Sequence, residues 1–127
     1  MTSLQQSLEM TRGDTREWSF AVLDASAAVV GLASHQSIRF TGKRSIADPD
    51  ASAIFAKSIA SGATTGGGFT LDLAAGTGTV KLSPSDTSGL DDAIILLSFD
   101  LQFVDADANK YTIAAGRLTV RPDVTLA

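Results

Sequence analysis

The chain has 127 residues, no cysteine and a formal net charge of -4 at pH 7. The length suits one domain over residues 1–127, and the lack of cysteine excludes disulfides, thiolate metal sites and a cysteine nucleophile. The acidic balance disfavours nucleic-acid binding, which depends on neutralising phosphates. No apolar run approaches the roughly 20 residues of a membrane span, so neither nucleic acid nor membrane insertion is expected.

Short alternating runs in the first part of the chain predict four strands separated by turns, two of which fall at residues 12–15 and 24–27. Trp18 is the only tryptophan, and we expect it in the core. The fourth strand, residues 36–44, is predicted to carry a basic outer face. The apolar residues that mark the four strands are Leu8 and Met10; Trp18, Phe20 and Val22; Val29, Val30 and Leu32; and Ile38 and Phe40.

The middle of the chain continues with turns and strands. Asp48-Pro49-Asp50 is a strong turn signal, and residues 53–59 fit either a strand or a helical turn. The glycine-rich residues 61–68 predict a mobile loop. Alternating apolar residues predict further strands at 69–73 and 79–83.

A short helical turn is predicted near residues 84–89. Ser83 can cap it, Pro84 suits its first position, and Asp86 complements its N-terminal dipole. Gly89 can end it. This turn is expected to link two strands across the ends of the sheets.

The longest pattern lies in residues 94–124. Apolar residues occupy every second position from Leu97 to Phe103, with polar side chains between them, which predicts a half-buried strand with one wet face. A second apolar run changes phase at Ala114 to Gly116, which predicts a β-bulge. With almost no helix elsewhere, these patterns indicate an all-β fold, a sandwich of roughly eight antiparallel strands.

Few side chains suggest a catalytic, metal-binding or receptor-binding role. His35 is the only histidine and is interpreted as a surface residue. Asp105, Asp107 and Asn109 have the alternate spacing of a calcium loop, but Lys110 stands where such a loop needs glycine, which favours a hydrated turn. Arg12-Gly13-Asp14 matches an integrin-binding tripeptide, but a match of three residues is weak, and a turn is sufficient to explain Gly13. We therefore expect no catalytic residue, metal site or cofactor.

Several segments along nearly the whole chain resemble the N-terminal domain family of phage baseplate upper proteins and related short tail-associated proteins of prophages. The residues that carry the resemblance are Arg12-Gly13-Asp14-Thr15 before Trp18 and Phe20, Val22-Leu23-Asp24, Val29-Val30, Ile38-Arg39-Phe40, Gly78 to Thr87, Phe99-Asp100-Leu101-Gln102, Thr112 to Gly116, and Leu118 to Thr125.

The resemblance implies an immunoglobulin-like β-sandwich that serves as a non-catalytic assembly protein of a phage or prophage tail or baseplate. The implied partners are other tail or baseplate proteins, with a homo-oligomer as a further option. The implied location is the virion tail, assembled in the bacterial host cytoplasm.

The expected mode of action is contact between proteins. The terminal run from Leu4 through Leu8 to Met10 is the first candidate for pairing with a neighbour by strand addition, and the basic residues Arg39 and Lys43 are candidates for meeting an acidic subunit. The alternative function is a carbohydrate-binding or cell-surface ligand-binding module that uses residues 61–68 or 12–14. The scarcity of aromatic residues argues against that alternative.

Overall fold

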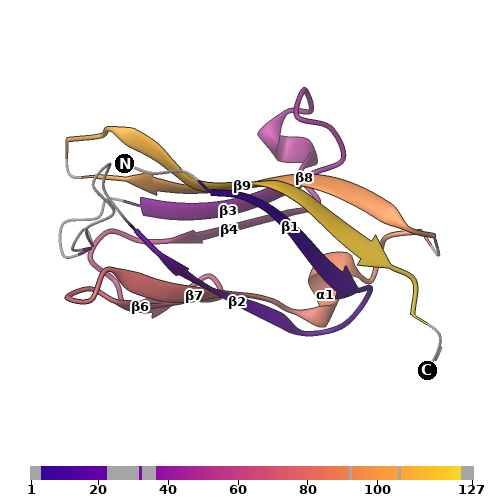
Figure 1. Cartoon of the computed structure of the whole chain (residues 1–127), viewed down its shortest axis with the longest axis horizontal. Helices are drawn as coiled ribbons and strands as arrows, with labels where there is room; N and C mark the ends of the chain where they lie inside the picture. The colour runs from indigo at the N-terminus through magenta and orange to yellow at the C-terminus, as the bar shows by residue number, and fades with distance from the viewer. Residues whose placement is uncertain (1–3, 23–31, 33–36, 92, 106, 124–127) are drawn as a thin grey trace.

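Two β-sheets lie face to face in the computed structural model, which describes residues 4–22, 32, 37–91, 93–105 and 107–123 (Figure 1). One sheet has five strands and the other has four. Each sheet buries one side of its strands against the other sheet. The predicted all-β sandwich is therefore confirmed.

The five-stranded sheet forms the upper layer in Figure 1. The two central strands form a long hairpin, as the alternation in residues 94–124 predicts. In spatial order the strands are β1 (Leu4–Thr11), β9 (Lys110–Arg121), β8 (Ile95–Val104), β3 (Ser37–Lys43) and β4 (Phe55–Ile59).

The four-stranded sheet forms the lower layer. Together, the order β9-β8-β3-β4 in one sheet and β2-β7-β6 in the other is the arrangement of an immunoglobulin-like sandwich. In spatial order the strands of this sheet are β2 (Arg16–Ala21), β7 (Thr77–Leu82), β6 (Phe69–Asp72) and β5 (Thr65–Gly66).

One strand pair departs from the predicted antiparallel arrangement. β1 runs parallel to β9, with Leu4 opposite Ala114 and Thr11 opposite Arg121. After β1 the chain crosses to the other sheet and continues as β2, so β1 forms no hairpin with its sheet neighbour. Without a hairpin, nothing forces the antiparallel direction.

The core follows the predicted alternation. Leu97, Phe99, Leu101 and Phe103 of β8 are all buried, while the residues between them face outward. Trp18 is only half-buried, because β2 lies at the edge of its sheet. Its ring still packs against the buried core, so the prediction of a core tryptophan holds in part.

The predicted bulge is present a few residues before Gly116. Leu101 pairs with Ala114 and Gln102 pairs with Thr112, so Ile113 is the extra residue on β9. Ile113 and its neighbour Ala114 are both buried as a result. The bulge resets the phase of β9, which lets Leu118 face inward again.

The helical turn is confirmed as α1 (Pro84–Thr87). Its capping residue Ser83 donates its backbone N–H to the Asp86 carboxylate at 2.7 Å. Asp86 also forms an ion pair with Lys57 of β4, at 2.9 Å. This ion pair ties α1 to the five-stranded sheet.

The predictions for the middle of the chain differ in detail from the structure. Residues 53–59 contain the strand β4, and the 3-10 turn η1 (Asp50–Ser52) precedes it. The glycine-rich residues 61–68 include β5, which pairs with β6. The predicted turn at 24–27 and the strand residues Val29 and Val30 lie outside the described residues.

Candidate interaction surface

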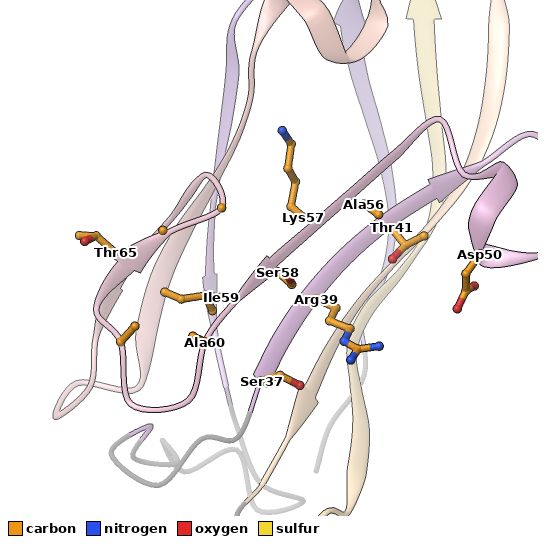
Figure 2. A pocket seen from close by; sticks show the side chains of 13 residues that line it. Ser37, Arg39, Thr41, Asp50, Ala56, Lys57, Ser58, Ile59, Ala60 and Thr65 are labelled. Atoms are coloured by element: carbon orange, nitrogen blue, oxygen red, sulfur yellow. The ribbon is translucent and has the colours of Figure 1, made fainter.

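The outer side of the five-stranded sheet is hollowed. Two adjoining concave surfaces of about 630 and 560 Å³ share Arg39, Thr41 and Asp50 in their lining. Figure 2 shows the first, with Arg39 and Asp50 on one side of the sheet and Lys57 pointing away from them. We call the second the β8 face, because the outward side chains of β8 line it.

Alternation along two paired strands builds the β8 face. On β3, Arg39 and Lys43 point outward, and on β8, Asp100 and Gln102 do so. Arg39 lies directly opposite Gln102, and Thr41 lies opposite Asp100. The face therefore presents cations and a carboxylate side by side, on a background of small residues such as Ala115.

The segment after β3 forms a wall beside the β8 face and rises from the sheet in Figure 1. Lys43 holds it: the Nζ atom donates to the Asp48 carbonyl at 2.9 Å and pairs with the Asp50 carboxylate at 2.6 Å. The hydrogen bond and charge of Lys43 lower the pKa of Asp50. Lys43 is thus engaged in loop structure, whereas Arg39 remains exposed on the face.

Exposed apolar side chains occur on the wall and around the start of β8. Among the described residues, the large hydrophobic side chains that stay exposed are Ile46, Ile94 and Leu96, at 82%, 59% and 47%. Ile46 lines the β8 face from the wall. Leu96 has the same outward phase on β8 as Ser98 and Asp100. Exposed apolar side chains beside a polar hollow are a common composition for a protein-binding surface.

Asp100 lies half-buried on the floor of the β8 face. Burial raises the pKa of its carboxyl group, and the charge of Lys43 and a hydrogen bond from Gln102 counteract part of that effect. The Gln102 Nε2 atom donates to Asp100 Oδ2 at 3.1 Å. The fold therefore keeps a carboxylate where its charge is unfavourable, a feature more frequent at functional sites than elsewhere.

Replacement of Asp100 by asparagine is expected to stabilise the protein at pH 7 by a few degrees in Tm. Because the pKa of Asp100 is raised in the folded state, its ionisation favours unfolding at neutral pH, and asparagine removes that cost while keeping an acceptor for Gln102. The gain should shrink as the pH falls through the raised pKa toward the ordinary value of 3.8. Thermal unfolding of both proteins from pH 7 to pH 3 measures this, and a gain independent of pH would contradict the explanation.

The predicted interface residues fall in two places. Arg39 and Lys43 share the β8 face, as their spacing predicts. Met10 is 6% exposed and belongs to the core, so only its backbone could meet a neighbour, and Leu8 is half-buried beside it. Leu4 is opposite Ala114 in the β1–β9 ladder.

Asp100, Gln102 and Ile46 were not predicted as interface residues from the sequence. The signal was present for the first two, because they occupy the polar phase of the longest strand. Ile46 gave no signal, since one apolar residue in a turn has no periodicity. Only the folded wall brings Ile46 to the β8 face.

The Arg12-Gly13-Asp14 tripeptide has a structural role. The Arg12 guanidinium donates to Asp123 Oδ1 at 2.6 and 3.0 Å and to the Leu90 carbonyl at 2.9 Å. The Gly13 N–H donates to the Thr87 hydroxyl at 2.9 Å. These contacts join β1 to α1 and to the segment after β9, so the arginine is not presented for a receptor.

The other candidates give no assembled site. Asp105 Oδ1 accepts backbone N–H bonds from Asp107 and Asn109, which makes it the cap of the β8–β9 turn. Within the described ranges no group of three or more His, Asp or Glu side chains could hold a metal ion, and no helix there is long and apolar enough to cross a membrane. His35 lies outside the described residues.

Comparison with protein-family models and with curated proteins found no match for this chain.

Proposed function

We propose that the chain is a non-catalytic structural protein that acts by binding other proteins through the outer side of its five-stranded sheet. The observation that carries the proposal is the exposure of Ile46, Ile94 and Leu96. Ile46 lines the hollow that contains Arg39 and Asp100, and Leu96 shares the outward phase of Asp100 on β8. A fold alone does not define a function, so the composition of this surface carries the proposal.

We further propose that the setting is the tail or baseplate of a phage or prophage particle, with other tail proteins as partners. The support is the resemblance given above. Two of the segments that carry it, Ile38 to Phe40 and Phe99 to Gln102, contribute Arg39, Asp100 and Gln102 to the β8 face. The segments that resemble the family thus include the centre of the proposed binding surface.

The alternative of a carbohydrate-binding module has less support. Sugar sites use exposed aromatic rings as stacking platforms. Five of the six phenylalanines are buried, and Phe20, Trp18 and Tyr111 are half-buried. No aromatic side chain is therefore exposed enough to offer a flat open platform.

A double replacement, Ile46→Ser with Leu96→Ser, is expected to reduce incorporation of the chain into particles by about tenfold or more. Each serine removes roughly 1–2 kcal/mol of apolar burial at an interface, while the exposed positions leave the fold intact. The measurement is complementation of a deleted gene, followed by quantification of the chain in purified particles. Thr70→Ser with Thr79→Ser, a cross-strand pair on the other sheet, is the matched control, and equal incorporation of both variants would contradict the proposed surface.

A further inference from the structure

β2 is an edge strand whose outer backbone groups face open space in the part of the chain that is described. Next along the chain, the Val22 N–H donates to the Gly76 carbonyl at 2.9 Å. Alternate residues of an antiparallel strand point their backbone groups the same way, so Trp18 and Phe20 also bond to β7. Glu17, Ser19 and Ala21 therefore direct their N–H and C=O groups away from the sheet.

The other three sheet edges, β4, β5 and β1, are less open. Gly67 covers β4, because a Cβ atom at Gly67 would fall 1.9 Å from the Ser58 carbonyl oxygen. β5 has two residues only. β1 carries a charge near its end, Glu9, which pairs with Arg121 at 3.1 Å. Charges, short strands and coverings protect sheet edges from pairing.

Among the described residues, β2 lacks such protection over its second half. Its six residues pair with β7 in continuous register, without a bulge. The residues from Trp18 to Ala21 carry no charge and no proline. Arg16 and Glu17 precede them, and Arg16 lies over the Trp18 ring at 5.8 Å. The open edge is thus uncharged over four residues and charged at one end.

An apolar crevice opens beside this edge. β1 and β2 lie on the same side of the sandwich (Figure 1), and a cavity of about 50 Å³ lies between them. Leu8, Trp18 and Phe20 line it, and it reaches the buried Phe40 and Phe99. A space of this size accepts a small apolar side chain.

We propose that β2 receives an extended segment of a partner protein as an added strand, with an apolar side chain of that segment in the crevice beside Trp18. This inference rests on the proposed function and adds a second contact, made at an edge of the four-stranded sheet. The unpaired backbone groups require a strand backbone, and the crevice requires an apolar side chain.

Charge further defines the segment. Glu17 is exposed, and its cross-strand neighbour on β7 is Lys81. An added strand would lie on the other side of Glu17, where a basic residue gives a favourable cross-strand pair and an acidic residue does not. The partner segment therefore has alternating apolar residues and a lysine or arginine next to Glu17.

The test uses Trp18 as its own reporter, because it is the only tryptophan and lines the crevice. The probe is a short capped peptide in which threonine and valine alternate, with lysine at one end. Addition beside β2 should bury Trp18 and shift its fluorescence to shorter wavelength in a saturable way. The same peptide with glutamate in place of lysine should bind roughly twofold to fivefold more weakly.

Two controls separate strand pairing from other binding. Ser19→Pro removes an outward N–H without touching the β2–β7 ladder and should weaken binding about tenfold or more, whereas Ser19→Thr keeps the N–H and should bind as the wild type does. A peptide with a central proline should not bind the unaltered protein, which tests the same point without altering β2.

Three results would overturn the inference. They are a Trp18 spectrum unchanged at millimolar peptide, equal binding by the proline peptide, and self-association of the protein alone that Ser19→Pro abolishes, which would assign the edge to a second copy. None of these results bears on incorporation into particles, so failure here is distinct from failure of the proposed function.

Discussion

Replacement of Phe40 by alanine is expected to lower the free energy of unfolding by about 3–5 kcal/mol. Phe40 is 2% exposed and lies on β3, the strand that also carries Arg39. Its ring contacts three others at centroid distances of 4.9 to 5.9 Å, those of Phe55, Phe99 and Trp18. The substitution would leave a cavity where rings from both sheets meet.

Urea unfolding measures this effect, with Thr41→Ala as the matched control. Thr41 is the next residue on the same strand but lines the β8 face, so its loss should cost less than about 1 kcal/mol. Because domains of this kind are stable by only about 5–15 kcal/mol, Phe40→Ala should remove a large share of the free energy of unfolding. Similar costs for the two variants would contradict the assignment of the core.

Replacement of Gly116 by valine is expected to cost about 2–4 kcal/mol and to displace β1 from its sheet. Gly116 has a φ of +154°, and a Cβ atom there would fall 1.9 Å from the carbonyl oxygen of Gln6. Gln6 is its partner on β1. The side chain would therefore collide with the backbone of the neighbouring strand, which cannot move without breaking the β1–β9 ladder.

Amide hydrogen exchange together with urea unfolding tests this result, and Gly62→Ala is the control. Gly62 also has a positive φ, of +71°, but a Cβ atom there meets nothing within 4 Å, so only about 1 kcal/mol of backbone strain is expected. Faster exchange should be confined to β1 and to the β9 residues that face it. Retained protection of β1 in Gly116→Val would show that the parallel pairing is wrong.

The elements that the sequence predicts well are those whose signal is local. The alternation of Leu97 to Phe103 depends only on which face of one strand is buried. The α1 turn depends on Ser83, Pro84 and Asp86 within a few positions of each other. The bulge is visible as a phase change in one strand, so its place was predicted to within a few residues.

The features that escaped prediction depend on partners distant in the chain. β1 could equally have paired antiparallel, because the Leu8–Met10 alternation says nothing about direction. β4 was ambiguous because Lys57 breaks the apolar pattern, and its pairing with Asp86 explains why a charge is tolerated there. The turn at Arg12-Gly13 was predicted and is present. The partner of the Arg12 side chain was not predicted, because it is Asp123, a residue 111 positions away.

For the β8 face too, local patterns predict the direction of single side chains but not which strands are neighbours. The outward positions of Arg39, Lys43 and Asp100 follow from alternation, whereas their gathering in one hollow depends on β3 and β8 being neighbours. The wall that carries Ile46 depends on the Lys43–Asp50 ion pair. No local pattern encodes either relation.

The composition of purified particles tests the account most directly. If the protein works as an assembly module, quantitative mass spectrometry of tail particles from induced cells should find the chain in a fixed ratio to the other tail proteins. Abundant expression with the chain confined to the fraction free of particles would contradict the central proposal.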